Sequence, residues 1–376
     1  MVAGAPRPRH GVAPVRGDAR TGGPPRRRLA GRSLAPASTG VRVAFGLVFV
    51  ISPPRAGSTL LTRVLHAMPE VLGGPEPHII PPLAHQGWWR PVHAAPYDPL
   101  RAARGQRAFV SRLPAGEADY LAACRAMTDH LYARLRDAER PSARLVVDKT
   151  PQHALCLPFL TRLYPDARYL VLTRHPAAIA SSYARSFFAG DHRAARRHDP
   201  ILERYIPPIA RLLRERPVAL LHLTHESFVT RPEVELRRIC DFLGVPVHPE
   251  ALDYQRAAVP PGPGDPTGVG RHRRPVADGL DAWVHDLARP AAFAEVRAQL
   301  DVLADEDLET WGTPRAGLWD ALHRAGQLPP PRPLPVRHAL RRWLLVTLRR
   351  DIDHRPHGRL VRAVHEASAV LLRGAS

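Results

Sequence analysis

The segment Gly46–His66 constrains the fold more than any other part of the chain. The apolar run GLVFVI ends at Ile51, the loop SPPRAG follows, and an apolar stretch with helical spacing begins at Ser58. In α/β proteins, a buried strand followed by such a loop and a helix is the usual phosphate-binding arrangement, because backbone amides and the helix N-terminus face the anion. The order predicts a strand, an anion-binding loop and a helix.

The loop lacks the lysine that nucleotide-binding loops carry. In the pattern GxxxxGK[ST], the lysine follows the second glycine and the hydroxyl holds magnesium. Here Ser58 follows Gly57, Thr59 comes next, and Arg55 lies two residues before the glycine. The Arg55 guanidinium can replace the missing cation. We therefore predict an anion cradle without magnesium; a plain turn into a buried helix is the alternative.

The fold class follows from apolar runs that alternate with helical patterns from Val43 to about Trp311. This alternation predicts an α/β domain with a doubly wound parallel sheet flanked by helices, which binds its ligand at the carboxyl ends of its strands. The expected strands are Gly46–Ile51, Leu145–Val147, Tyr169–Thr173 and Val218–Thr224, and the expected helices are Ser58–His66, Ala118–Arg136, Gln152–Tyr164, Pro176–Phe187 and Pro232–Leu243.

Four regions are expected along the chain. Residues 1–40 are rich in Arg and Pro with Asp18 as their only acid, which predicts a disordered arm; a transit peptide or an upstream misplaced start are the alternatives. Residues 43–327 form one main domain. A proline-rich linker, 328–335, precedes a basic amphipathic tail, 336–376, whose helices are expected to pack on the core or a partner, or to contact a membrane surface.

The formal charge of +19 comes almost entirely from arginine, since Lys149 is the only lysine among the 54 Lys and Arg residues. Because the arginines are spread along the chain, we interpret them as a composition bias and expect no specific nucleic-acid partner.

Cys124, Cys156 and Cys240 lie far apart without CxxC spacing, so no disulfide framework and no zinc or other metal site is expected. No apolar run approaches the roughly 18–20 residues of a membrane span. We expect a cytoplasmic protein.

A second pair of candidate anion ligands lies in the segment RHPAAIASS. Arg174 ends an expected strand, and Ser182 lies two turns into the next helix. Eight residues in one continuous helix would span about 12 Å. The turn between Arg174 and Ser182 shortens this distance, so both side chains can reach one phosphate.

These motifs together resemble the sulfotransferases that use 3′-phosphoadenylyl sulfate (PAPS). The similar segments occur in the same order between about Phe45 and Trp283: SPPRAGSTLL, DKTP, RHPAAIASS, the strand-loop-helix that ends in FLG at Gly244, and a GDP-containing stretch from Gly264. The resemblance implies a P-loop-like sheet, a sulfuryl transfer that needs no metal, and a PAPS co-substrate that leaves as 3′,5′-ADP. Dimers recur in this family, so a homodimer is compatible with it.

The resemblance also assigns the donor contacts. It implies that Arg55, Ser58 and Thr59, with the amides of Ala56, Gly57 and Leu60, hold the 5′ phosphosulfate. Arg174 and Ser182 would hold the 3′ phosphate, which distinguishes PAPS from ATP. Arg271 and Arg273 lie in a segment that would close over the nucleotide, although it departs from the RKG form usual in the family.

Two residues are candidates for the chemistry itself. Glu76 lies in GGPEPHIIPP and resembles the catalytic glutamate of the tyrosylprotein and bacterial branches, where it would be the general base; a surface glutamate is the alternative, and His78 or His85 could take its place. Lys149, in DKTP, is the single lysine, and we expect its compact ammonium to contact the bridging oxygen of the donor. The alternative is that Lys149 has no special role and is the one lysine that remains by chance in an arginine-rich chain.

The predicted function is transfer of a sulfuryl group to a hydroxyl of a small molecule, lipid or carbohydrate, and a bacterial metabolite or glycoconjugate is favoured. Trp88, Trp89 and Tyr97 and the segment 187–209 are candidate acceptor contacts, unless they pack in the core. A P-loop kinase-like phosphotransferase, a nucleotide-binding relative without turnover and an arginine-rich nucleic-acid-binding protein are the alternatives.

Overall fold

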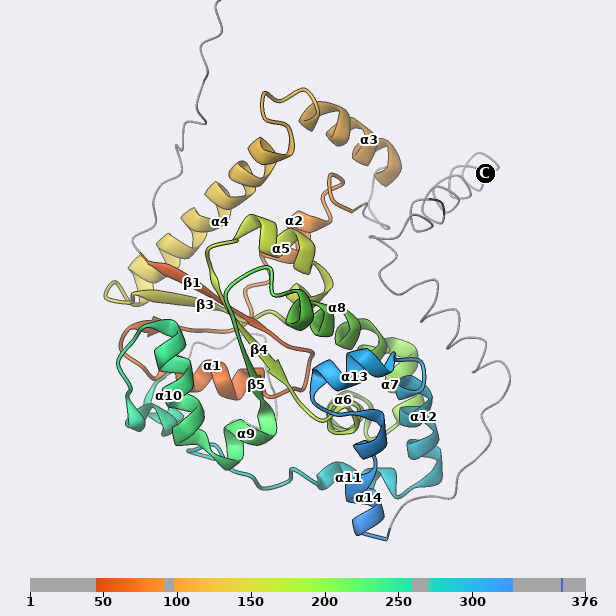
Figure 1. Cartoon of the computed structure of the whole chain (residues 1–376). Helices are drawn as coiled ribbons and strands as arrows, with labels where there is room; N and C mark the ends of the chain where they lie inside the picture. Colours follow the sequence, from red (N-terminus) through yellow and green to blue (C-terminus); the bar gives the residue numbers. More distant parts are fainter. Residues whose placement is uncertain (1–44, 91–97, 259–269, 271, 327–359, 361–376) are drawn as a thin grey trace, which may run out of the picture. The chain divides into compact units, whose positions relative to one another are not determined.

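A computed structural model describes residues 45–90, 98–258, 270, 272–326 and 360 (Figure 1). The expected arm, the linker and, apart from Leu360, the tail lie outside these residues. The centre of the fold is a five-stranded sheet in the order β2-β3-β1-β4-β5. All pairings are parallel, as predicted for this α/β chain.

The strands are β1 (Gly46–Ile51), β2 (Val71–Leu72), β3 (Leu145–Asp148), β4 (Arg168–Thr173) and β5 (Leu220–Thr224). β1 lies in the middle, with β3 on one side and β4 on the other. The chain adds strands toward the β2 edge first and then crosses to the β5 edge, so the winding direction reverses beside β1. In such sheets the crevice at the carboxyl ends of the central strands is the ligand site.

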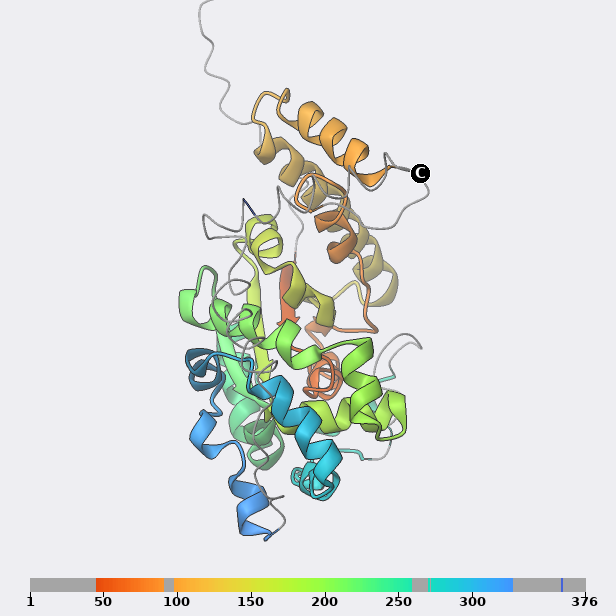
Figure 2. The same ribbon diagram turned by 90° about the vertical axis from the view of Figure 1, so that its right-hand side faces the viewer.

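Both faces of the sheet are covered, so every residue of β1 and β4 except the first is buried. Alternate residues of β1 point to opposite faces: Phe49 and Ile51 belong to one core and Val48 and Val50 to the other. The second core is closed by α1 (Ser58–His66) and α10 (Pro232–Leu243). Figure 2, turned by 90°, shows helices on both sides of the strands.

Most of the remaining helices lie over the first core or beside it, whereas those within residues 225–230 and 249–256 contribute to the second core. They are α2 (Ile80–Ala84), α3 (Pro99–Val110), α4 (Glu117–Glu139), η1 (Pro151–Leu155), α5 (Leu157–Leu163), α6 (Pro176–Phe188), α7 (His192–His198), α8 (Ile201–Glu215), α9 (His225–Thr230), η2 (Pro249–Leu252), η3 (Tyr254–Arg256), α11 (Ala282–Leu287), α12 (Pro290–Leu300), α13 (Asp305–Trp311), η4 (Arg315–Gly317) and α14 (Asp320–Arg324). In the ranges described, no helix is long and apolar enough to cross a membrane.

The expected helix Gln152–Tyr164 is wrong as a single element. The structure has the short η1, a break at Cys156 with φ −131°, and then α5. Pro158 is the cause, because its ring would clash with the carbonyl of residue 154 in a continuous helix and it has no N–H to donate. Proline is tolerated in the first turn, so α5 begins next to it.

Candidate functional site

The loop after β1 turns sharply into α1. Gly57 is the N-cap of α1 with φ 94° and ψ 13°, and no side chain caps the helix there. A Cβ at Gly57 would lie 2.4 Å from Nδ1 of His225, so both the backbone and its neighbour demand glycine. Arg55, at φ 69°, is a non-glycine residue in the left-handed region, and strain of this kind is often found at functional sites. The loop presents the N-terminus of α1 to the carboxyl edge of the sheet.

The structure brings together the two predicted anion sites. Arg55 donates from Nε to Oγ of Ser182 over 3.2 Å, and its guanidinium lies 5.8 Å from the ring centre of Phe187. Arg174 donates from Nη1 to the carbonyl oxygen of Arg55 over 3.1 Å. The loop after β1 is therefore bonded directly to the end of β4 and to α6.

The β4–α6 turn is held by residues far along the chain. Glu226, just after β5, accepts a hydrogen bond from the amide of His175 over 2.9 Å. Trp311 of α13 donates from Nε1 to the carbonyl of Arg174 over 2.9 Å. The His175 ring stacks on Trp283 of α11 with centroids 4.5 Å apart. These contacts fix the backbone of the turn that carries Arg174.

Two histidines beside this turn are neutral in the native protein. Burial, reinforced by the positive charge of Arg174, lowers the pKa of His175 to about 4 and that of His225 to about 3. Sequence analysis overlooked His225. Its position directly after β5, at the carboxyl end of a strand, was the available signal.

Lys149 and Glu76, the two candidates for the chemistry, contact each other. The Lys149 ammonium forms an ion pair with Oε1 of Glu76 and lies 3.4 Å from Oγ1 of Thr59 in the anion loop. The Lys149 side chain is 2% exposed and that of Glu76 is 15% exposed. The ammonium thus lies between the predicted donor loop and the predicted base.

The DKTP segment is fixed by a buried carboxylate. Asp148 is fully buried and accepts hydrogen bonds from the hydroxyls of Tyr132 and Thr150, and Nε2 of His153 lies 3.6 Å away. Burial and the Asp148 charge hold the pKa of Tyr132 well above its usual range, so the phenol remains a donor. Asp148 anchors the loop that carries Lys149.

His78 is bonded to Glu76. Its Nε2 lies 3.1 Å from Oε2 of Glu76, and its backbone amide donates to Oγ1 of Thr150 over 3.3 Å. The backbone of His78 is left-handed, with φ 52°. His85, the other candidate, is the C-cap of α2.

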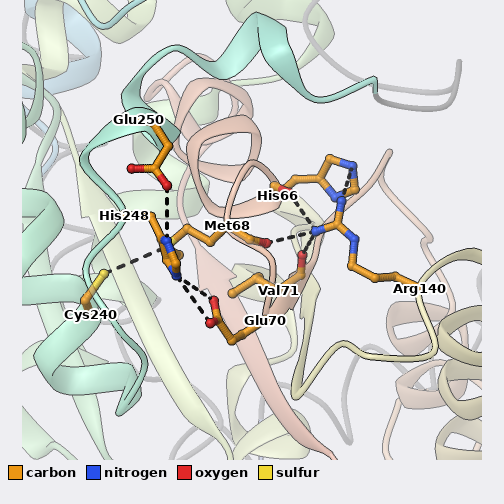
Figure 3. Close-up of polar contacts among 8 residues, drawn as sticks. All are labelled: His66, Met68, Glu70, Val71, Arg140, Cys240, His248 and Glu250. Atoms are coloured by element: carbon orange, nitrogen blue, oxygen red, sulfur yellow. Dashed lines mark hydrogen bonds and ion pairs between the residues drawn. The ribbon is translucent and has the colours of Figure 1, made fainter.

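The turn between α1 and β2, which precedes the loop that carries Glu76, is held by several hydrogen bonds (Figure 3). Arg140 donates from Nη1 to the carbonyls of His66, Met68 and Val71, at 2.8 and 2.9 Å for the first two. His66 accepts at Nδ1 from the amide of Gly73 over 3.2 Å. Burial and Arg140 lower the pKa of His66, which favours the neutral ring that can accept this bond.

The opposite side of the same turn is held by His248, which lies between two glutamates in Figure 3. Its Nε2 is 3.1 Å from Glu70, and its Nδ1 is 3.3 Å from Glu250. His248 follows α10, so this cluster joins the α1–β2 turn to the helices on that face of the sheet.

The other predicted residues are placed as follows. Arg271 lies outside the described residues, and Arg273 is 71% exposed and paired with Asp253 at 2.7 Å. Trp88 packs against Tyr120 and Trp89 against Phe159, so both rings contribute to the core. Backbone positions Ala56 and Leu60 lie in the anion loop and the first turn of α1, and Tyr97 falls outside the described residues.

Metal ligands were not expected. Among the residues that the structure describes, no three His, Cys, Asp or Glu side chains gather in a way that would hold an ion. The three cysteines are free and buried.

The sequence matches the model of a known protein family. The model of the sulfotransferase family matches residues 48–249, which is more than half of the chain. The matched range runs from within β1 to beyond α10 and includes Arg55, Glu76, Lys149, Arg174 and Ser182, whose contacts are described above.

Two curated relatives are similar at low identity. The nodulation protein NoeE of Sinorhizobium fredii is 26% identical over 227 residues, which are 53% of this chain and 50% of NoeE. The chain therefore spans about half the length of that relative. A putative protein-tyrosine sulfotransferase of Caenorhabditis briggsae is 23% identical over 212 residues, 55% of this chain and 69% of the relative.

Solved structures were also compared. The sulfotransferase domain from the curacin biosynthetic pathway superposes with a TM-score of 0.46 and 23% identity, covering 68% of this chain and 97% of that domain. A sulfotransferase from Alicyclobacillus acidocaldarius gives a TM-score of 0.37 and 19% identity, covering 72% of this chain and all of that one (100%).

Proposed function

Because the chain belongs to the sulfotransferase family, we propose that it transfers the sulfuryl group of PAPS to a hydroxyl group of a small molecule, lipid or carbohydrate. Family membership supports a sulfotransferase activity in general. The observation that supports the choice of donor is the hydrogen bonding among Arg55, Ser182 and Arg174, which joins the two segments predicted to bind anions.

The residues present fit a donor with two separate anionic groups. The N-terminus of α1, with the hydroxyls of Ser58 and Thr59, suits the 5′ phosphosulfate. The guanidinium of Arg174 and the hydroxyl of Ser182 suit a 3′ phosphate, since charged donors bind phosphate oxygens strongly. ATP has no 3′ phosphate, so this second group would favour PAPS over ATP.

Sulfuryl transfer resembles phosphoryl transfer, in which positioning and charge stabilisation supply most of the catalysis. Glu76 would accept the proton of the acceptor hydroxyl as the new oxygen–sulfur bond forms. Lys149 would stabilise the negative charge that develops on the leaving phosphate. Its place between Thr59 and Glu76 supports this division of roles, because the donor and the acceptor would meet there.

The test of the donor is the melting temperature of the purified protein with 3′,5′-ADP or with ATP and magnesium. A ligand at 100 times its Kd stabilises a protein by about 2.7 kcal/mol, which raises the melting temperature by several degrees. We expect this response to 3′,5′-ADP in the parent and its loss in Arg174→Ala. Arg162→Ala is the matched control, because it removes an arginine that contacts Glu117 on α4 and the Trp89 ring and lies outside the predicted donor contacts.

Each result points to one function. Selective stabilisation by 3′,5′-ADP that Arg174→Ala abolishes and Arg162→Ala keeps would establish the donor site. A stronger response to ATP and magnesium would favour the kinase-like alternative. No response to either nucleotide would contradict the proposal.

The acceptor is then found by screening hydroxyl compounds with labelled PAPS. Saccharides, phenols and long-chain alcohols cover the proposed classes, and a tyrosine-containing peptide covers the class that the name of the Caenorhabditis briggsae relative suggests. We propose a saccharide or metabolite hydroxyl as the natural acceptor. A cytoplasmic location and a homodimer stay predictions.

A further inference from the structure

The ion pair between Lys149 and Glu76 raises a problem for the proposed reaction. The ammonium occupies Oε1 of Glu76, yet the two groups have different tasks, one at the leaving phosphate and one at the acceptor hydroxyl. Lys149 must move its ammonium toward the donor for the reaction to occur, and Thr59, 3.4 Å away, lies in that direction. Glu76 then loses the partner that holds it.

His78 holds the other oxygen of the same carboxylate. Nε2 of His78 lies 3.1 Å from Oε2 of Glu76. An ionised carboxylate can only accept hydrogen bonds, so Nε2 carries the proton and donates it. The His78 side chain is 40% exposed, so in this tautomer Nδ1 can accept a hydrogen bond from water. The contact does not depend on Lys149.

The backbone of His78 is fixed by the residue that follows Lys149. Oγ1 of Thr150 accepts from the amide of His78 over 3.3 Å and donates to the buried Asp148 over 2.9 Å. The left-handed conformation of His78 costs free energy for a residue other than glycine, and such conformations persist where the surroundings impose them. Here the left-handed conformation of His78 turns its imidazole back toward Glu76, only two positions earlier.

We propose that His78 is a positioning residue that keeps the Glu76 carboxylate aimed at the acceptor once Lys149 has left it for the donor. This inference rests on the sulfuryl transfer proposed above. His78 and Glu76 are then not competing candidates for the base: Glu76 takes the proton, and His78 donates the hydrogen bond that fixes Glu76. Proton transfer from the acceptor hydroxyl to Glu76 accompanies formation of the oxygen–sulfur bond, and the bond from sulfur to the 5′ phosphate breaks, leaving 3′,5′-ADP.

Two substitutions separate this role from a role in folding. In His78→Gln, the amide nitrogen is as many bonds from Cα as Nε2 of histidine, so it can still donate to Glu76. In His78→Asn, the amide is one bond short, although asparagine suits the left-handed backbone better than glutamine. A purely structural role would favour the asparagine variant, whereas the positioning role favours the glutamine variant.

The assay measures 3′,5′-ADP released from PAPS by parent and variants, with water alone and with whichever saccharide, phenol or long-chain alcohol raises the turnover. Hydrogen bonds to charged groups contribute enough that we expect kcat to fall about 10- to 100-fold in His78→Asn. His78→Gln should restore most of this loss. Both variants should keep the parent's stabilisation by 3′,5′-ADP, because His78 lies outside the donor contacts.

Other outcomes would overturn the proposal in distinct ways. Equal kcat in the parent and both variants, with the nucleotide response intact, would sink the role of His78 and leave the sulfotransferase proposal standing. The same conclusion would follow if the asparagine variant kept more activity than the glutamine variant. A parent that neither responds to 3′,5′-ADP nor consumes PAPS would overturn both proposals.

Discussion

Gly57→Ala is expected to destabilise the protein for two reasons that can be separated. At φ 94°, an alanine is strained whatever the space around it, which costs about 1 to 2 kcal/mol. The new Cβ would also lie 2.4, 2.9 and 3.3 Å from three ring atoms of His225, so the ring must move. Overpacking of this kind costs about 1 to 3 kcal/mol. We expect a total loss of about 2 to 5 kcal/mol in the free energy of unfolding.

Gly312 supplies the matched control. It ends α13 with φ 88° and ψ 12°, close to the conformation of Gly57, and a Cβ there would meet nothing within 4 Å. Gly312→Ala therefore measures the backbone strain alone. The assay is urea unfolding of each variant, and the difference between the two alanine variants gives the contribution of His225.

A third variant tests the contact with His225 directly. His225→Ala removes the ring that the new methyl group would meet, so adding it to Gly57→Ala should bring the loss close to that of Gly312→Ala, with a coupling energy of about 1 to 3 kcal/mol. If Gly57→Ala cost no more than Gly312→Ala, or if the two substitutions at 57 and 225 were additive, the close approach of His225 to the anion loop would be refuted.

Two further predictions concern the chemistry and the charge of the site. Lys149→Arg should lower PAPS turnover at least about 10-fold while the protein still responds to 3′,5′-ADP, because a planar guanidinium keeps the positive charge but does not replace a compact ammonium aimed at the leaving oxygen; near-normal turnover would contradict this. For His175, burial and Arg174 lower the native pKa from 6.5 to about 4, so the unfolded chain binds the proton first. Its contribution to stability is complete above pH 6.5 and is lost as the pH falls toward 4, so His175→Gln should show a shallower decline of the urea midpoint in this window. An unchanged decline would argue against a neutral His175 in the native state.

Local sequence patterns predicted much of the scaffold. The expected bounds of β1, α1 and α10 agree with the structure, because a buried apolar run, a loop glycine, and a proline and glycine at the two helix ends act over a few residues. The parallel sheet was confirmed as well, since alternating strands and helices admit few other arrangements. The break at Cys156 was missed although Pro158 signals it.

The contacts of the candidate site could not be read from local patterns. Ser182 meets Arg55 across 127 positions of sequence, and only the order of the strands in the sheet brings them together. The bond between His78 and Glu76 is short in sequence, but it depends on a left-handed backbone that Thr150 stabilises from another segment. The two-residue strand β2 is too short to leave a periodic signal.

The hydrogen bond from Trp311 to the carbonyl of Arg174 has a consequence for the order in which the protein matures. Trp311 lies well beyond residue 249, where the family match ends. During synthesis, the segment that bears Arg55, Lys149 and Arg174 leaves the ribosome long before α13 does, and domains assemble as the chain emerges. The nascent chain thus already contains Arg55, Lys149 and Arg174, but it lacks the hydrogen bond from Trp311 that fixes the Arg174 carbonyl. The site reaches its final geometry only after α13 has been synthesised.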